Sequence, residues 1–422
     1  MKLEEKIKLG IKEIHKINKM QQKKFIYFPS FSSKLSILKK DDMSIGDIPT
    51  FRFWDDRFPE KFRHKYFLIT AAMFFNKKGN IIEECGMEGC CIFGDSGGFQ
   101  VASGVLQWDI KIREQIFNWL QDNCQISMNL DIPPKINYKG KFRECLDISY
   151  DNIKYFHEKQ SGKTKFLNVL QMDEAEEQFD IWYNKIKMFE FNGWGIGGTL
   201  NQHYNAIYII ALLLKNKELD KKLCEYIHFL GATNPFNFLI YAVIQKNLNK
   251  YYPHCTVTTD SSTPMLQPVY GNWAHSINYK NWNFNYLWVG NKGTVKYEEE
   301  AKLPCILEDC PICSNINFGK IAEYTGKGHS TNFTLHVGYH NFFIFLKSVD
   351  WISNLVDSGN DVLKGFFTMD ILNMIKSIDE MFEKPEDALR IFYKNKKLYV
   401  KLSNSVEKMV DKNIITSEEL FA

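Results

Sequence analysis

The sequence predicts an α/β protein built on a (β/α)8 barrel of the TIM type, with a zinc-binding insertion and a helical C-terminal segment. Three observations predict this fold class. Short apolar runs alternate with longer helical patterns, several of those runs end in polar or glycine-rich groups, and a cysteine-rich stretch is followed by helical sequence. A barrel of about 250 residues with insertions accounts for most of a chain of 422 residues.

The composition is that of a globular protein. Hydrophobic residues make up 45% and charged residues 24%, which allows a sizeable core and excludes a disordered chain. The net charge of +3 neither requires nor excludes a nucleic-acid partner. No secretory segment opens the chain, and no run approaches the roughly 20 apolar residues of a membrane span, so we expect a cytoplasmic protein without a membrane partner. The 10 cysteines lack small-domain spacing, which indicates reduced thiols.

The beginning of the chain has the periodicity of a helix. Apolar residues recur with the spacing of one helix face at Leu3, Ile7, Ile11, Ile14 and Ile17. We therefore expect an N-terminal helix over residues 1–30, the barrel over 31–350 and a helical C-terminal segment over 351–422.

Apolar runs bounded by glycine, proline or aspartate are the expected barrel strands. They are KYFLITAAMFF, CCIFGDSGG, CQISMNLDIPP, KFLNVLQM, GWGIGG, EYIHFLGATNPF and TVTTDSS. Helical patterns lie between them over residues 109–121, 150–159, 175–189, 202–214 and 235–247. Strand, turn and helix repeating this often favours a barrel over a doubly wound sheet.

Polar or glycine-rich groups follow several of these runs. They are Asp95 with the three residues after it, Asp131, Gln171, residues 193–198, Gly231 and Asp260. In a barrel the C-terminal ends of all strands open on one face, where active sites are assembled. The sequence therefore predicts a pocket at the barrel mouth.

A metal site is indicated near the end of the barrel. Its expected ligands follow a Cys-x4-Cys-x2-Cys-x26-His spacing and are Cys305, Cys310, Cys313 and His340. A Cys-x-x-Cys pair with a distant histidine suits a closed, structural Zn²⁺ site without an open catalytic position. The other clustered thiols, Cys85, Cys90 and Cys91, are interpreted as structural, because adjacent cysteines cannot both ligate comfortably.

The stretch 94–100 carries the most specific motif. An aspartate at a strand end, followed by the paired glycines Gly97 and Gly98, lets a ligand approach backbone amides, although the same residues also form ordinary turns. This motif, DSGGFQ, resembles the signature of the tRNA-guanine transglycosylases.

The resemblance continues in order along the chain, over about residues 65 to 345. LDIPP is similar to the strand end whose aspartate reads the guanine edge, and NVLQM to the family's Val-Gln element. GWGIGG resembles its glycine-rich loop, HFLGATNP its apolar-Gly-x-x-x-Pro element, and TTDSSTP its nucleophile loop. The resemblance implies a barrel enzyme that exchanges a guanine base in a nucleic acid.

Two aspartates would carry that chemistry. Breaking a glycosidic bond passes through an oxocarbenium-like transition state, and a carboxylate on the far face of the sugar can capture C1′. We assign this nucleophile to Asp260. A second carboxylate must pass protons between the departing and incoming bases, and Asp95 is the candidate general acid/base. The alternative interpretation of both is a helix cap or turn residue.

The base itself needs acceptors for N1 and N2 and donors for O6. Asp131 can accept from N1 and N2, while Gln171 and the backbone near Gly198 can donate to O6. The backbone at Ser96 and Gly97 is also expected to contact the substrate. Two apolar side chains, Phe99 and Leu230, could sandwich the flat base, although either could equally be core. The target base must leave its stack to reach such a pocket.

For the metal site, the resemblance implies a Cys-x-Cys-x-x-Cys element followed by a His-Asn pair. Glu308 stands where the first family cysteine would be. Cys305 is close enough to replace it, and Glu308 is the alternative ligand.

Two departures from the family pattern bear on the substrate. Residues 265–273 contain no arginine or lysine, where tRNA-acting members hold anticodon-loop phosphates, and no carboxylate closely follows Gly198. With Ser261 and Ser262 beside the nucleophile, these losses resemble the DNA-acting branch, the DpdA-type transglycosylases of bacteria and phages. DNA is therefore favoured over tRNA, with a free 7-deazaguanine base such as 7-cyano-7-deazaguanine as co-substrate and companion DNA-modification proteins as possible partners.

Alternatives remain open at this point. The chain could be a divergent tRNA enzyme, or it could be a non-catalytic nucleic-acid-binding subunit. The presence of both Asp95 and Asp260 argues against the non-catalytic subunit. If the substrate is DNA, its phosphates need another partner, and the lysine-rich first 40 residues, including Lys19, Lys23 and Lys24, are the expected one.

Overall fold

The structure is a computed structural model that describes residues 23–32, 35–39, 43–173, 175–198, 203–232, 234–278, 282–289, 298–325, 331–358 and 360–410. Most of the expected N-terminal helix, with Lys19, lies outside the described residues.

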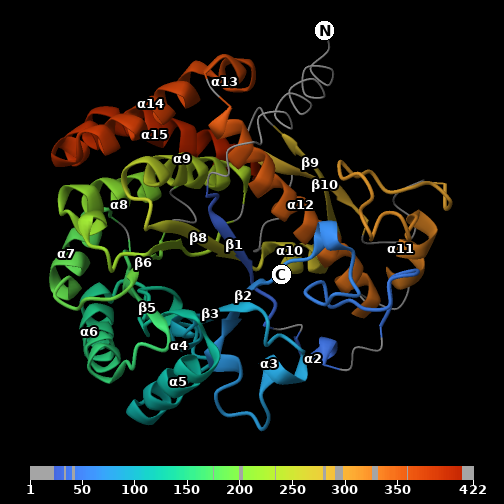
Figure 1. Ribbon diagram of the computed structural model, residues 1–422, viewed down its shortest axis with the longest axis horizontal. Helices are drawn as coiled ribbons and strands as arrows, with labels where there is room; N and C mark the ends of the chain where they lie inside the picture. Colours follow the sequence, from blue (N-terminus) through green and yellow to red (C-terminus); the bar gives the residue numbers. More distant parts are fainter. Residues whose placement is uncertain are drawn as a thin grey trace.

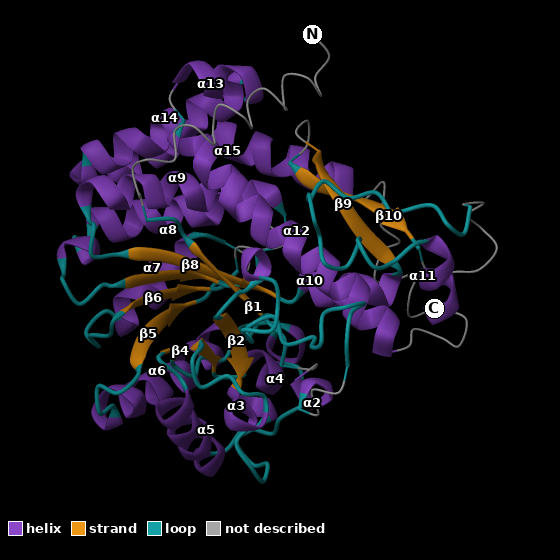
Figure 2. Ribbon diagram, turned by 45° about the vertical axis from the view of Figure 1, so that its right-hand side comes forward, coloured by secondary structure: helices purple, strands orange, loops and turns teal. Residues whose placement is uncertain are grey.

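Eight parallel strands form a sheet that is nearly closed into a barrel (Figure 2). They are β1 (Ile26–Pro29), β2 (Tyr66–Thr70), β3 (Cys91–Asp95), β4 (Ile126–Met128), β5 (Lys165–Leu170), β6 (Gly193–Ile196), β7 (Tyr226–Phe229) and β8 (Thr256–Ser261). Neighbours pair in chain order from β2 to β8, and β8 pairs with β1. A single parallel bridge between Ser30 and Leu68 links β1 to β2. The predicted barrel fold is confirmed.

The first strand was not among the predicted runs. Residues 26–29 form β1, so the barrel begins before the expected boundary at residue 31. This strand has only four residues and directly follows the lysine-rich helical pattern, so its sequence gives no separate signal. Its place in the sheet depends on pairing with β8, more than 200 residues away, where Phe28 lies beside Asp260.

Helices follow most strands and form the outer layer (Figure 1). Those in the first part of the chain are α2 (Leu35–Leu38), α3 (Ile81–Glu84), α4 (Gly98–Ala102), α5 (Ile110–Asn123), α6 (Phe142–Lys159), α7 (Glu177–Ile186), α8 (Tyr204–Lys215) and α9 (Pro235–Tyr251). All five predicted helical patterns fall on helices, and α6 begins eight residues earlier than its pattern. The long helix α12 (Thr331–Asp357) packs against α9 and β1 and completes the layer.

An insertion separates β8 from α12. It contains α10 (Thr263–Leu266), the antiparallel hairpin β9 (Asn272–Asn278) and β10 (Asn283–Trp288), and α11 (Phe318–Thr325). Figure 1 shows it to one side of the barrel, next to α12. The three expected cysteine ligands lie in the loop between β10 and α11.

The C-terminal segment is helical, as predicted. It consists of α13 (Asn360–Phe366), α14 (Met369–Glu383) and α15 (Ala388–Val410) (Figure 1). Helices α14 and α15 pack on α8 and α9, and α13 contacts α12 and α14. The approximate boundary expected near residue 350 falls within α12, which continues to Asp357. The Thr368 side chain caps α14 by accepting a hydrogen bond from the Ile371 amide.

The barrel interior is a separate small core. It is formed by the inward side chains Phe28, Leu68, Phe93, Ile126, Met128, Leu167 and Val169. Because strand side chains alternate between faces, the inward side chains beyond this layer stand at the C-terminal mouth. In the described part of the chain, no helix is long and apolar enough to cross a membrane.

Candidate active site

The two predicted catalytic aspartates stand at the same end of the barrel. Asp95 is two residues after the inward Phe93 on β3, and Asp260 is paired in register with the inward Phe28 on β1. Both carboxylates therefore face the mouth, with the apolar interior core beneath them. Their charges are close enough to influence each other, since the charge on Asp260 contributes to raising the pKa of Asp95.

Asp95 is held by two donors. The Thr70 hydroxyl donates to Oδ2 over 2.9 Å, and the Gly97 amide donates to Oδ1 over 3.1 Å. Burial nevertheless raises the pKa of Asp95, because those two hydrogen bonds only partly offset the loss of solvation. A raised pKa suits a group that must both give and take a proton. Thr70, at the end of β2, was not predicted as a site residue.

The paired glycines after Asp95 are required by the backbone. Gly97 has φ of 94°, in the left-handed region that favours glycine. A Cβ on Gly98 would lie 1.9 Å from the carbonyl oxygen of Asp131, so only glycine allows the start of α4 to approach the end of β4 this closely. The DSGG turn thus brings Asp95 and Asp131 into one site.

Three predicted contact residues have different exposures. Ser96 is buried, and its hydroxyl donates to the Asn129 carbonyl over 3.0 Å, so it links the ends of β3 and β4. Phe99 is 54% exposed on the first turn of α4. Leu230 is partly buried against the interior core. The sandwich of Phe99 and Leu230 around a base stays a prediction.

Asp131 and Gln171 form a buried pair. The Gln171 amide Nε2 donates to Asp131 Oδ2 over 2.8 Å. Burial raises the pKa of Asp131 to about 7, with a further contribution from the charge of Asp95, while the hydrogen bond from Gln171 opposes the shift. The pair meets Gly197 of the next loop, where a Cβ would lie 2.1 Å from Gln171 Oε1. Three strand ends thereby come together around one acid and one amide.

The glycine-rich loop after β6 is described as far as Gly198. Gly198 has φ of 75°, in the left-handed region, and its carbonyl accepts a hydrogen bond from the Asn205 side chain over 3.2 Å. Residues 199–202, where the sequence lacks a carboxylate, lie outside the described residues.

Among the described residues, the contacts that hold Asp260 are made to Oδ1. The Gly231 amide donates to its Oδ1 over 2.8 Å, and Nε2 of His228 lies 3.4 Å from the same atom. The His228 ring stacks on Phe93 with centroids 4.1 Å apart. His228 was not predicted as a site residue. Its strand position was the available signal, because His228 lies on the same strand face as Tyr226 and Leu230, which both contact the interior core.

The four predicted metal ligands come together. Their ligand atoms, from Cys305, Cys310, Cys313 and His340, all lie within 4.8 Å of one another and could hold a metal ion. Nδ1 of His340 is 3.2 Å from the Cys313 sulfur and 3.7 Å from the Cys310 sulfur. Three thiols and one imidazole are a donor set compatible with zinc. Between the two alternatives for the remaining ligand, the cluster contains Cys305 and not Glu308.

The surroundings of His340 orient it for a metal. Its Nε2 is 2.5 Å from the Ala274 carbonyl, which can only accept, so Nδ1 presents its lone pair to the thiols. Trp273 stacks on the imidazole with centroids 3.6 Å apart and donates to the Pro304 carbonyl over 2.9 Å. Asn341 binds β9 through the Ala274 amide and the Asn272 carbonyl. The cluster therefore ties the insertion to α12.

The remaining thiols behave as structural residues. All 10 cysteines of the chain are free of disulfides. Cys85 and Cys90 are buried, and burial raises their pKa values to about 11 and about 12. Neutral, buried thiols of this kind are unreactive.

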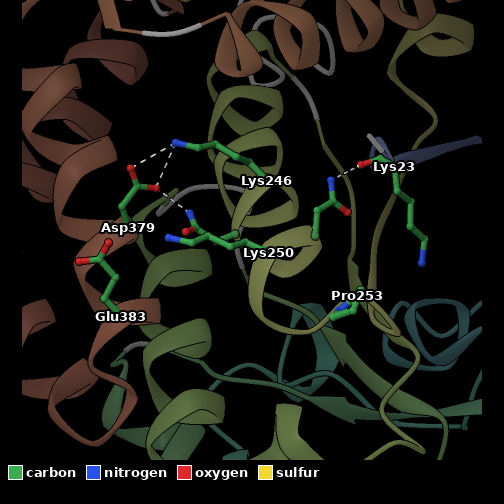
Figure 3. Close-up of a pocket in the computed structure, with 8 residues that line it drawn as sticks. Lys23, Lys246, Lys250, Pro253, Asp379 and Glu383 are labelled. Atoms are coloured by element: carbon green, nitrogen blue, oxygen red, sulfur yellow. Dashed lines mark hydrogen bonds and ion pairs between the residues drawn. The ribbon is translucent and has the colours of Figure 1, made fainter. Parts of the chain in front are cut away.

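Two of the predicted phosphate contacts, Lys23 and Lys24, lie away from the barrel mouth. Both residues precede β1, at the end of the barrel opposite the mouth. Lys23 lines a cleft of about 570 Å³ between α9 and α14, and Lys24 pairs with Asp350 over 3.2 Å. Figure 3 shows this cleft, where Lys246 pairs with Asp379 and the Lys23 side chain points away from that pair.

In comparisons with known proteins, no family model matches the chain, and a search of the curated proteins finds no match.

Proposed function

We propose that this protein is a base-exchange transglycosylase that replaces a guanine in DNA with a 7-deazaguanine such as 7-cyano-7-deazaguanine. The observation that carries the proposal is the mouth of the barrel, where two carboxylates with different environments face one space. Asp95 is partly buried with a raised pKa, and Asp260 is held through Oδ1. Two acids in unlike surroundings can take unlike roles.

In the first half of the reaction, Oδ2 of Asp260 bonds to C1′ of the target nucleotide while the C1′–N9 bond breaks. Asp95, protonated, gives its proton to the departing guanine. In the second half, Asp95 as a carboxylate takes the N9 proton of the incoming base. That nitrogen bonds to C1′, and the electron pair of the Oδ2–C1′ bond returns to Asp260. Each acid ends in its starting state, and no other reactant is needed.

Asp131 and Gln171 would recognise the base. The carboxyl of Asp131 accepts from N1 and N2 of guanine, and the Gln171 amide, which donates to Asp131 in the free protein, turns to O6. Binding thus exchanges one buried hydrogen bond for several to the base. The same edge is present on a 7-deazaguanine, so one pocket serves both the departing and the incoming base.

DNA is preferred over tRNA because of the segment after the nucleophile. Residues 263–270 form α10 and a short 3-10 helix without arginine or lysine. Instead, Leu266, Val269 and Tyr270 are exposed there, which leaves an apolar surface beside the mouth. Such a surface does not hold the phosphates of an anticodon loop.

A non-catalytic binding subunit is the competing class. It would not need a partly buried acid with a raised pKa beside a second, oriented carboxylate, and an unused charge removed from water is destabilising. The retention of Asp95 and Asp260 with their donors therefore favours an enzyme.

Nucleoside analysis tests the proposal. DNA and tRNA would be digested from cells that express the chain and are supplied with a 7-deazaguanine, with Asp260→Asn as the matched control. We expect the modified nucleoside in DNA with the wild type and not with the variant. Modified tRNA with unmodified DNA would instead identify tRNA as the substrate. Modification of neither would contradict the proposed enzymatic activity.

A further inference from the structure

The buried imidazole of His228 has no task in the reaction described above. It is fully buried on β7, just beneath the mouth. Two contacts fix the ring: it stacks on Phe93 at an interplanar angle of 28°, and its Nδ1 lies 2.9 Å from the Thr258 hydroxyl. The other nitrogen, Nε2, can therefore point in only one direction.

The Asp260 carboxylate lies close to that nitrogen. Nε2 lies 3.4 Å from Oδ1, and among the described residues it has no hydrogen-bond partner of its own. A buried polar atom without a partner destabilises a fold, so its retention at a site calls for an explanation. Contacts among catalytic groups are often long in a free enzyme and tighten when the substrate binds.

We propose that His228 is a positioning residue for the nucleophile, which donates from Nε2 to Oδ1 of Asp260 during base exchange. This inference rests on the proposed function. With the Gly231 amide already on Oδ1, the second donor leaves Oδ2 as the oxygen that meets C1′.

The donor also has a chemical consequence. A hydrogen bond to Oδ1 stabilises the charged carboxylate more than the neutral ester of the covalent intermediate. It therefore favours the second half of the reaction, in which the Oδ2–C1′ bond breaks and Asp260 leaves with the electron pair. Loss of the donor should slow this release more than it slows the capture of C1′.

Single-turnover kinetics with duplex DNA and labelled guanine test this directly. In His228→Phe, the flat ring can still stack on Phe93 but the donor is gone. We expect the release rate to fall roughly 10- to 100-fold, with more covalent protein–DNA adduct on a denaturing gel than in the wild type. His228→Gln, which keeps an N–H donor, should restore most of the rate. Equal loss of adduct and exchange in both variants would overturn the proposal.

A matched control separates positioning from packing. His64 is also a buried histidine, with its Nε2 3.0 Å from the Tyr27 carbonyl, but it precedes β2 at the other end of the barrel. His64→Phe should lower the melting temperature without changing the fraction of trapped adduct. If His64→Phe and His228→Phe change that fraction equally, the effect belongs to packing and the proposal is wrong.

A second measurement does not depend on activity. Nitrogen-15 NMR of histidine-labelled protein, with the His228→Gln variant to assign the signal, reports which ring nitrogen carries the proton. A proton on Nε2 supports the proposal, and a neutral ring protonated only on Nδ1 overturns it. If the wild type forms no adduct and exchanges no base, the proposed function fails, while this measurement still decides the hydrogen bond.

Discussion

At the scale of single residues, the site depends on carboxylates that the fold keeps in unlike surroundings. Asp131 is 5% exposed, whereas the side chain of Asp260 is 16% exposed. The sequence motif identifies these residues as candidates, but their protonation depends on burial and neighbours that belong to other strands. The pKa of Asp131, raised to about 7, is the clearest example.

The pH dependence of stability should reveal that shift. The folded pKa of Asp131 lies above its unfolded value, so the protonated acid favours folding at low pH, and this stability is lost as the pH rises toward about 7. Between pH 5 and pH 8, the free energy of unfolding of the wild type should fall relative to Asp131→Asn by roughly 2–3 kcal/mol. Urea unfolding of both proteins at the two pH values measures this. If the free energies of unfolding of the two proteins change with pH in parallel, the pKa of the Asp131 carboxyl is not raised.

Substitutions of the two proposed catalytic aspartates should have different effects. Asp260→Asn should abolish both exchange and adduct, because an amide cannot capture C1′. Asp95→Asn should abolish exchange but leave some adduct, because capture can proceed slowly without an acid while the incoming base cannot be deprotonated. Denaturing gels with labelled DNA distinguish the two outcomes. A trapped adduct with Asp260→Asn would rule out this nucleophile.

At the scale of elements, strand ends and the turns after them were largely predictable. Each of the seven predicted runs contains a strand, because their apolar character and their glycine or aspartate boundaries are local signals. β1 and the contact between His228 and Asp260 were not predictable in this way. Both depend on pairing with distant strands, which periodicity cannot reveal.

The close approach of α4 to β4 gives a prediction at this scale. Gly98→Ala should lower the free energy of unfolding by about 1–3 kcal/mol, since its Cβ would lie 1.9 Å from the Asp131 carbonyl oxygen. Gly89→Ala is the matched control, because a Cβ there meets nothing within 4 Å and should change stability by less than about 0.5 kcal/mol. Chemical denaturation compares them. Equal effects of both substitutions would contradict the close packing.

At the scale of the whole molecule, the metal cluster joins the insertion to the barrel. Its cysteines come from one loop and His340 comes from α12, so a bound ion would stabilise the folded arrangement of both. We expect about one zinc per purified chain, measured by elemental analysis, and unfolding at lower temperature after chelation.

Substitutions identify the ligands. Cys310→Ser or Cys313→Ser should destabilise the protein by more than about 4 kcal/mol, because a structural site contributes folding free energy directly. Cys305→Ser should lower zinc content similarly, whereas Glu308→Ala should retain it, since Glu308 lies outside the cluster. A metal-free wild type of unchanged stability would rule out the zinc site.

The sequence by itself determined the barrel class, the order of most elements and the residues at the strand ends, because apolar periodicity, turn residues and ligand spacing are local properties of a chain. Tertiary structure alone decided the rest. It placed Thr70 and His228 against the two aspartates, put Cys305 rather than Glu308 in the metal cluster, and moved Lys23 and Lys24 away from the mouth. These outcomes depend on contacts between residues far apart in sequence, and only closure of the barrel brings such residues together.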